Sequence, residues 1–430
     1  MKPIRYLIYL VLLLATPLFF FVAFACAFLV RVTGNRMTTK PRLVWGSTPI
    51  INNSYWSRGM LEAGFISETF TTHFYSVHQR SDWDRVLSEE YKWAHPRIKP
   101  FIAFLHALFR YDIFFISFNG FFVGNTSMRY WQAQLLKLAN KKIVVIPYGS
   151  DAYVYRRLRS TGTIHGLLMS YPAEAKRQTE ISRDVDYWCR HADVVIPGIM
   201  GLDGLGRWDA LMLSALSIDL RLWNASKKWS PADGRGQTVI VVHAPNHRGI
   251  KGTEFVIDAV QKLQAEGLRI ELRLLENLQN HEVRRILGEE ADILVEQLIG
   301  TGHGLNAIEG MASGLPTISN LEDDAYMTPL RRWSYFSECP LVSATPENLV
   351  EVLRKLVTRP ELRHELGRAG RAYVEKYHGL DSSQYLFTNV IDYLYGRKDS
   401  LINLYHPLLG EYPNRSPKIQ HPLFNNRIIN

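Results

Sequence analysis

The stretch VIVVHAPNHRGIKGTEF, Val239 to Phe255, places an apolar run, a glycine-containing loop and the start of a helix in direct succession. A short β-branched run that leads through a loop into an amphipathic helix is typical of a βα unit around a parallel sheet. Short apolar runs that end in Gly, Ser, Pro or Asn alternate with amphipathic stretches along the rest of the chain as well. The sequence therefore predicts an α/β protein.

The pattern divides into two halves. The strands expected in the first half are Leu43 to Gly46, Ile113 to Phe118, Ile143 to Pro147 and Val194 to Pro197. In the second half, strands are expected at Val239 to His243, Ile270 to Leu275, Ile293 to Val295 and Pro316 to Ser319, and helices near Thr253 to Glu266, His281 to Glu289 and Leu305 to Ser313. Two Rossmann-like domains would place the carboxyl ends of their strands face to face, with a ligand in the crevice between them.

Domain limits follow from the same pattern and from changes in composition. The predicted segments are an apolar anchor segment (1–40), an N-terminal Rossmann-like domain (41–222), a polar linker (223–237), a C-terminal Rossmann-like domain (238–380), a helix that packs back on the N-terminal domain (381–396) and a tail without clear pattern (397–430). With 430 residues, 47% hydrophobic and 21% charged, the chain is neither disordered nor a multi-span membrane protein. Three cysteines allow no disulfide framework.

A net charge of +9 indicates an anionic partner. The basic residues are scattered, and no run resembles a nucleic-acid-binding arm, so nucleic acid is not expected as a partner. Anionic lipid surfaces and phosphorylated small molecules fit this charge better.

Residues 6–30 carry no charge. As a helix they would extend about 37 Å, enough to cross a hydrocarbon core of about 30 Å. A single transmembrane helix is expected, and a cleaved signal peptide is the alternative, although its apolar part should be shorter. Basic residues after the segment outnumber those before it, which favours a cytoplasmic catalytic domain. The Asn-x-Ser/Thr sequons would suit a lumenal domain instead.

Two loops in the second half are suited to phosphate. Arg248 and Lys251 lie three residues apart just before a helix, so both can reach a diphosphate at the helix N-terminus; the alternative is a solvated basic loop. Gly302 and Gly304 precede a second helix, where N–H groups up to Asn306 would face another phosphate. Glu309, in the second turn of that helix, would accept hydroxyl protons from a ribose, unless it is an ordinary exposed glutamate.

Over about residues 190 to 395 the chain resembles the retaining nucleotide-sugar glycosyltransferases of family 4, which have the two-domain GT-B fold. The resemblance rests on the segments HADVVIPG, RGIKGTEFVIDAVQKL and AIEGMASGLPTIS. It implies that Arg248 and Lys251 contact the diphosphate and that Glu309, the second glutamate of the family's Glu-x7-Glu motif, binds the ribose. Thr301 stands where the first glutamate is usual. Divergent members also lose that residue and often have an acidic residue and Gln upstream, as Glu296 and Gln297 are here.

The N-terminal half offers fewer candidates. Gly46 and Ser47 end one expected strand, and Gly149 and Ser150 end another, so both loops would face the acceptor. Asp151 would orient or deprotonate an acceptor hydroxyl, or else cap the following helix.

Histidines and metal ligands complete the candidates. His303 in the glycine loop is the second catalytic candidate, and His165 and His243 are weaker ones that are more often structural. No cluster has the spacing of metal ligands, and the family resemblance also implies independence from a metal ion.

Together these features predict a membrane-anchored, retaining glycosyltransferase of polysaccharide biosynthesis that needs no cofactor. It would move a sugar from a nucleotide-diphosphate sugar to a membrane-associated saccharide acceptor. Catalysis would be mainly electrostatic, through stabilisation of the charge on the departing diphosphate. A GT-B nucleotide-sugar epimerase and a non-catalytic nucleotide-sugar-binding protein are the alternatives.

Overall fold

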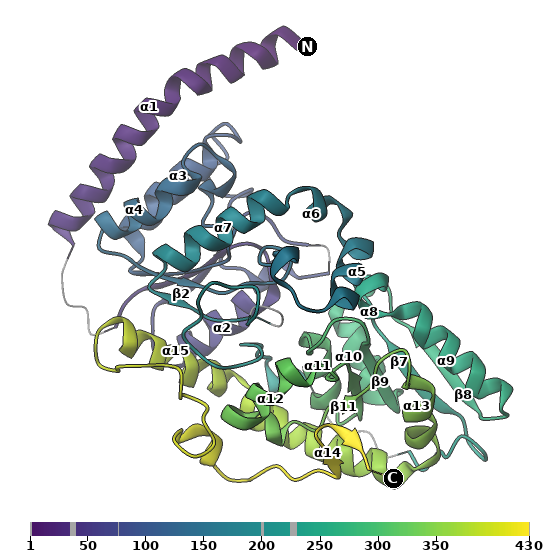
Figure 1. The fold of residues 1–430 in the computed structure, drawn as a ribbon. Coiled ribbons are helices and arrows are strands. Elements are labelled where there is room, and N and C mark those ends of the chain that lie inside the picture. Colours follow the sequence, from purple (N-terminus) through teal and green to yellow (C-terminus); the bar gives the residue numbers. More distant parts are fainter. Residues whose placement is uncertain (1, 35–39, 76, 199–201, 224–229, 430) are drawn as a thin grey trace.

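The computed structural model describes residues 2–34, 40–75, 77–198, 202–223 and 230–429, with side chains from residue 17 onward. Two parallel sheets, each with helices around it, form two domains (Figure 1), as the sequence predicts. The N-terminal sheet has the order β3-β2-β1-β4-β5-β6. Its strands are β1 (Leu43–Ser47), β2 (Ser67–Thr71), β3 (Arg85–Val86), β4 (Ile113–Ile116), β5 (Lys142–Val145) and β6 (Val194–Val195).

The C-terminal sheet has the order β11-β10-β9-β7-β8. Its strands are β7 (Val239–His243), β8 (Ile270–Leu274), β9 (Ile293–Gln297), β10 (Thr317–Ser319) and β11 (Val342–Ser343), and a separate antiparallel pair is formed by β12 (Leu423–Phe424) and β13 (Arg427–Ile428). The helices are α1 (Lys2–Thr33), α2 (Ile51–Glu62), α3 (Lys99–Arg110), α4 (Gln132–Leu138), α5 (Thr161–Ser170), α6 (Pro172–Lys176), α7 (Gln178–His191), α8 (Arg248–Lys251), α9 (Thr253–Ala265), α10 (Asn280–Glu289), α11 (Leu305–Ala312), α12 (Asp324–Trp333), α13 (Leu349–Thr358), α14 (Pro360–Tyr377) and α15 (Leu380–Leu394).

Each predicted strand coincides with a strand of these two sheets, but β2, β3 and β11 were not predicted. The sequence of β2, SETFT, is polar, yet most of it is buried. The Thr69 hydroxyl bonds the carboxylate of Asp84 at 2.9 Å, and the Thr71 hydroxyl donates to the Ser47 carbonyl at 3.2 Å. Because these polar groups are satisfied by residues distant in sequence, the hydrophobic pattern does not reveal the strand.

Each sheet has one point where the strand order reverses. In the N-terminal sheet this point lies between β1 and β4, and in the C-terminal sheet it lies between β7 and β9. In open α/β sheets, ligands bind outside the carboxyl ends of the strands at such a switch point. The loops after β1, β4, β7 and β9 are therefore the expected ligand sites.

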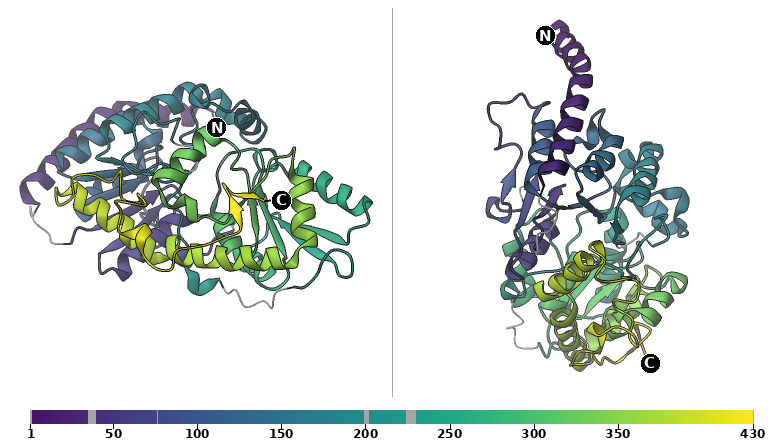
Figure 2. Two further views of the ribbon diagram at one scale, coloured as in Figure 1. Left: turned by 60° about the horizontal axis from the view of Figure 1, so that its bottom comes forward. Right: turned by 90° about the vertical axis from the view of Figure 1, so that its left-hand side faces the viewer.

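The chain passes between the domains at the linker, again between α14 and α15, and once more in the C-terminal tail, which returns to the edge of the C-terminal sheet. Helix α14 packs on α11 in the C-terminal domain, whereas α15 packs on α2 in the N-terminal domain (Figure 2). The α15 residue Phe387 lies 4.7 Å from Trp45 of β1, centroid to centroid, so the last long helix completes the first domain's core. Residues 224–229 of the predicted linker lie outside the described residues.

Helices α5 and α8 make a second contact between the domains. A Cβ atom at Gly166 would lie 2.9 Å from Ile250 Cδ1, and one at Gly249 would lie 2.8 Å from Met169 Cβ. The hydroxyl of Ser170 also accepts a hydrogen bond of 2.8 Å from the N–H of Ile250. Only glycine at both positions allows this approach.

The N-terminal helix α1 lies against α3 and α4 (Figure 1). Ala23, Ala27 and Val30 are buried there, while Phe21 is 73% exposed. No helix in the described part of the chain combines the length and apolar character needed to cross a bilayer. The predicted anchor over residues 6–30 is therefore not found, and the side chains of residues 6–16 lie outside those described.

The C-terminal tail is more regular than predicted. Asn425 and Asn426, both with positive φ, connect β12 and β13. The N–H of Ser343 in β11 donates to the Asn426 carbonyl at 2.7 Å. The tail thus covers the edge of the C-terminal sheet.

Candidate functional site

The crevice at the C-terminal switch point is formed by the loops after β7 and β9. The β7 loop leads into the single turn of α8, ends at Gly252 with φ +72°, and continues into α9. The β9 loop contains the glycine-rich segment 300–304 and continues into α11. Because β7 and β9 are adjacent parallel strands, residues about 50 positions apart in sequence meet here.

Lys251 forms a buried ion pair in this crevice. Its ammonium bonds the carboxylate of Glu296 and, at 2.9 Å, Oε1 of Gln297. The Glu296 side chain is fully buried, and its other oxygen accepts a hydrogen bond of 3.0 Å from the hydroxyl of Ser319. Burial of both charges is tolerated because each has its partner.

The glycine loop lies directly on this pair. Gln297 donates to the carbonyls of Gly300 and Gly302 at 3.0 and 2.9 Å, and the N–H of Gly302 donates to Asn320 at 2.8 Å. A Cβ atom at Gly304 would lie 3.0 Å from Glu296 Oε1. The N–H of Gly302 is thus used within the loop, and the N–H groups that a helix start leaves for a ligand are those of the first turn of α11.

Arg248 does not join Lys251. It is 45% exposed and pairs with Glu254 at 2.9 Å and Glu276 at 3.2 Å on the surface. These acidic neighbours hold its pKa above the usual value. To contact a diphosphate, Arg248 would have to leave both partners.

Glu309 is buried, which excludes the interpretation as an ordinary exposed glutamate. Its Oε1 accepts a hydrogen bond of 3.3 Å from Asn280 of α10. Burial raises the pKa of Glu309 to about 7, and Asn280 and the charge of Arg284 oppose this shift. Burial raises the pKa of Tyr55 in α2, and the charge of Glu309 adds to this rise. The Glu309 carboxylate therefore lies within electrostatic reach of the N-terminal domain.

Asn306 and Thr301 lie on the same loop and helix. The Asn306 amide donates to the Ala244 carbonyl at 3.2 Å. Its Oδ1 atom is buried with no hydrogen-bond partner among the described residues. Thr301 is half-buried between two glycines.

The two histidines near the crevice are packed in the interior. His303 stacks on Phe336 with centroids 6.1 Å apart, and burial lowers its pKa to about 4. His243 contacts the Val295 carbonyl at 2.7 Å through Nδ1 and the Thr253 hydroxyl at 2.9 Å through Nε2, and burial lowers its pKa to about 4 as well. A carbonyl can only accept, so Nδ1 carries the proton of this neutral ring and ties β7 to β9.

At the N-terminal switch point, Asp151 binds backbone groups. One carboxylate oxygen accepts from the N–H of Phe118, and the other accepts from those of Tyr148 and Gly149, each at 3.0 Å. Burial raises the Asp151 pKa to about 6, and the hydrogen bonds oppose the rise. The side chain thus joins the loops after β4 and β5, and half-buried Ser150 lies beside it.

Gly46 and Ser47 end β1 at the same crevice. A Cβ atom at Gly46 would lie 2.0 Å from the carbonyl oxygen of Phe70, so no larger residue fits. The hydroxyl of Ser47 accepts a hydrogen bond of 3.1 Å from the N–H of Phe122. Within the described residues, no group of three or more His, Cys, Asp or Glu side chains is placed to hold a metal ion.

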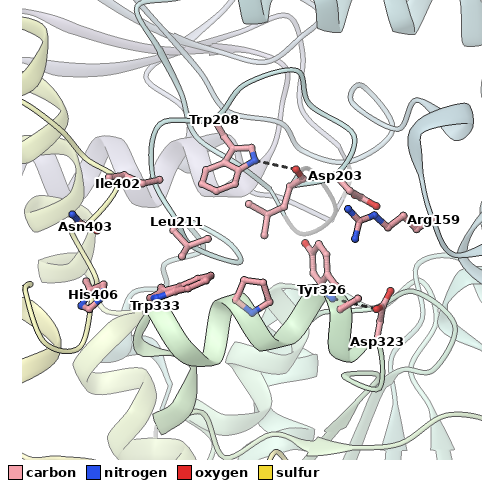
Figure 3. Close-up of a pocket in the computed structure, with 13 residues that line it drawn as sticks. Arg159, Asp203, Trp208, Leu211, Asp323, Tyr326, Trp333, Ile402, Asn403 and His406 are labelled. Atoms are coloured by element: carbon pink, nitrogen blue, oxygen red, sulfur yellow. Dashed lines mark hydrogen bonds between the residues drawn. The ribbon is translucent and has the colours of Figure 1, made fainter.

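The sequence did not predict one cavity of the described part of the chain. It lies between the loop 202–211 of the N-terminal domain, helix α12 and the C-terminal tail (Figure 3). One signal was present in the α12 sequence: Met327 and Leu330 face the core, yet Pro329 and Trp333 supply a second apolar face. A surface helix usually has one apolar stripe and polar residues elsewhere, so further apolar residues indicate a second contact.

No protein-family model matches the chain, and neither does any curated protein. Among solved structures, it is similar to a glycosyltransferase from Rickettsia africae (11% identity, 84% of this chain and 100% of that chain covered, TM-score 0.49). It is also similar to MnaA from S. aureus in a structure with UDP (12%, 84% and 97%, 0.47) and to the wall teichoic acid polymerase TagF with CDPG (12%, 92% and 97%, 0.41). At these identities and TM-scores the likeness carries no argument about activity, which has to rest on the residues of the site.

Proposed function

We propose that the chain is a glycosyltransferase of GT-B type that moves a sugar from a nucleotide-diphosphate sugar to a hydroxyl group. The observation that carries the proposal is the C-terminal crevice, where a glycine loop covers the buried Lys251–Glu296 pair and leads into the helix of buried Glu309. The sequence resemblance assigns donor binding to the same residues. Retention of the anomeric configuration and independence from a metal ion belong to the proposal, on that resemblance alone.

In this proposal, the donor diphosphate lies at the start of α11. The N–H groups of the first helical turn and the ammonium of Lys251 would stabilise the negative charge that develops when the sugar leaves. Lys251 Nζ lies 3.6 Å from the position of a Cβ atom at Gly304, so its charge is close to that turn. Glu296 then holds Lys251 in place.

Glu309 would bind the ribose. A buried carboxylate with a pKa near 7 has lost much of its hydration, and two hydroxyl donors would restore hydrogen bonds to it. The unpartnered Oδ1 of Asn306, three residues earlier on the same helix, offers a further acceptor. Both groups lie on α11, so one rigid element would position the nucleoside.

The N-terminal switch point supplies the candidate base of the proposal. A pKa of about 6 suits Asp151 for general-base catalysis near neutral pH, although its oxygens already bind three backbone N–H groups. His303 remains a weaker candidate because it is neutral and packed against Phe336. A lipid-linked acceptor is supported by the exposed apolar face of α1, on which Phe21 and Val32 lie.

Thermal unfolding with UDP, GDP, ADP and CMP tests the donor site. A nucleotide that binds only the folded chain raises the melting temperature, and we expect this for one of the diphosphates. Glu309→Gln should remove the shift. Glu289→Gln, at an exposed α10 glutamate, is the matched control and should keep it. If no nucleotide raises the melting temperature of the wild type, the proposal fails and a non-catalytic role replaces it.

A second assay separates transfer from epimerisation, which would use the same donor residues without an acceptor. Incubation of the enzyme with the identified nucleotide sugar alone should leave the sugar stereochemistry unchanged, and addition of a saccharide acceptor should release the nucleotide diphosphate. Transfer should persist with a chelator present. An epimerised nucleotide sugar in the absence of acceptor would contradict transfer as the main activity.

A further inference from the structure

The cavity beside α12 has a volume of about 540 Å³, within the range of small-molecule sites of about 300 to 1,000 Å³. Figure 3 shows Trp208 on the upper wall and Tyr326 and Trp333 from α12 on the lower wall. Residues of the C-terminal tail, among them Ile402 and His406, close one end. With Arg159, four separate segments of the chain therefore build one pocket between the domains.

Two features hold the aromatic walls in position before any ligand arrives. The indole N–H of Trp208 donates to the carbonyl of Leu202 at 3.0 Å, which fixes the ring. On α12, Met327 and Leu330 are fully buried in the core, and the neighbouring face with Tyr326 and Trp333 lines the pocket. Preorganised aromatic rings bind a ligand at a low cost in conformational entropy.

The other end of the pocket is polar. Figure 3 shows Arg159 between the carboxylates of Asp203 and Asp323. Oδ1 of Asp323 accepts a hydrogen bond of 3.2 Å from the N–H of Tyr326 and so caps α12. Burial raises the pKa of Asp203, the charge of Asp323 adds to the rise, and Arg159 opposes it. Two carboxylates beside one guanidinium disfavour a phosphate or another anion and favour a ligand that donates hydrogen bonds.

The pocket adjoins the glycine loop of the donor crevice. The carbonyl of Asn320 accepts the hydrogen bond from the N–H of Gly302, and its amide donates to the Leu298 carbonyl at 2.9 Å. Asp323 follows Asn320 by only three residues. The carboxylate end of the pocket is thus connected to the loop that would hold the donor.

We propose that this pocket binds a neutral saccharide, which serves as the acceptor of the transfer. A pyranose ring has apolar C–H faces that pack on indole and phenol rings, and its hydroxyl groups donate to carboxylates. An apolar chain would leave the carboxylates unpaired, and a nucleotide would bring a phosphate against them. The role as acceptor site rests on the proposed function, whereas saccharide binding does not.

Saturation-transfer NMR on the full chain tests the proposal. The probes are the methyl glycosides of glucose, galactose, mannose and N-acetylglucosamine, together with octyl β-glucoside, whose chain and ring protons give separate signals. Ring protons of at least one glycoside should receive saturation from the wild type. Trp333→Ala should weaken that signal at least about fivefold, because it removes one wall of the pocket. Trp333→Phe should recover part of the signal.

Matched variants separate binding from folding. Trp333 is 44% exposed, and Trp93, which is 79% exposed and does not line the pocket, provides the control Trp93→Ala, which should bind as the wild type does. Asp323→Asn keeps an oxygen for the helix cap and removes the charge, and it should weaken binding about threefold. Melting temperatures of all variants should stay near that of the wild type.

The outcomes distinguish this inference from the proposed function. Absence of ring saturation, saturation of only the octyl chain, or equal signals from wild type and Trp333→Ala would overturn the saccharide pocket. With any of these results, the proposed donor site would still be supported if UDP or another nucleoside diphosphate raised the melting temperature. Conversely, ring saturation without any nucleotide effect would support saccharide binding and contradict the glycosyltransferase.

Discussion

At the switch point of the N-terminal sheet, Asp151 and Ser47 bind backbone N–H groups, whereas at that of the C-terminal sheet Lys251 and Glu296 bind each other. The two crevices share a topology but differ in how their polar groups are satisfied. The fold fixes the backbone N–H groups that bind Asp151 and Ser47, so a ligand does not replace these hydrogen bonds. A side-chain ion pair can rearrange toward a charged ligand. The comparison therefore assigns charge recognition to the C-terminal crevice and a fixed wall to the N-terminal one.

The largest expected effect is that of Lys251→Ala. It leaves the buried Glu296 charge unpaired and should lower the free energy of unfolding by about 3 to 5 kcal/mol. Urea denaturation measures this loss. The double variant Lys251→Met with Glu296→Gln should recover most of the stability and still lack the nucleotide shift. Wild-type stability of Lys251→Ala would show that the pair is not needed by the crevice.

Asp151→Ala should come next. It leaves three buried N–H groups without their acceptor and should cost about 3 kcal/mol of unfolding free energy. Asp151→Asn keeps one acceptor oxygen and should cost less. If Asp151 belongs to the fixed wall, both variants retain the nucleotide-induced shift in melting temperature. Loss of that shift in Asp151→Asn would contradict the contrast between the two crevices.

Glu309→Gln tests the buried carboxylate through pH. The pKa of Glu309 rises from 4.5 to about 7 on folding, so ionisation destabilises the folded wild type as pH rises through this window. The variant lacks this loss, so its stability relative to the wild type should increase by about 2 kcal/mol between about pH 5 and about pH 7. Buried histidines affect both proteins equally and cancel. A relative stability that does not change with pH would contradict a buried, ionising Glu309.

The smallest effect should follow Arg248→Ala. Arg248 lies at the surface with two acidic partners, so its loss should change the melting temperature of the free protein very little. If it turns to the diphosphate on binding, affinity should fall about threefold, because the new contact replaces existing ones. Isothermal titration with the nucleotide found in the panel measures this. Unchanged affinity would leave Lys251 and the start of α11 as the diphosphate site.

The sequence was most informative where chemistry and hydrophobic pattern are local. The strand Val239–His243, the glycine loop before α11 and the place of Glu309 on that helix all follow from residues close together in the chain. The pairing of Lys251 with Glu296 did not follow, because it depends on β9 lying beside β7 rather than β8. For the same reason, Asp151 was predicted to orient an acceptor or cap a helix and instead joins two loops.

Sequence patterns could not predict the aromatic pocket, for a different reason. Trp208, Trp333 and Ile402 come from three segments, and each is ordinary in its own segment. The pocket arises only because the tail folds back between the domains. Anchoring by residues 6–30 was predicted from hydropathy alone, which does not show that Ala23 and Ala27 form a packing face against the first domain.

The repeated passage of the chain between the domains has a mechanical consequence. Trp223 and Val239 flank the first crossing, and the second lies near His378, whose carbonyl accepts a hydrogen bond of 2.8 Å from Ile218. Together with the return of the C-terminal tail, these crossings restrict how far one domain can move relative to the other. The α5–α8 contact restrains the domains further. Any separation of the domains has to break the hydrogen bond between Ser170 and Ile250 and draw Gly166 and Gly249 out of their close packing.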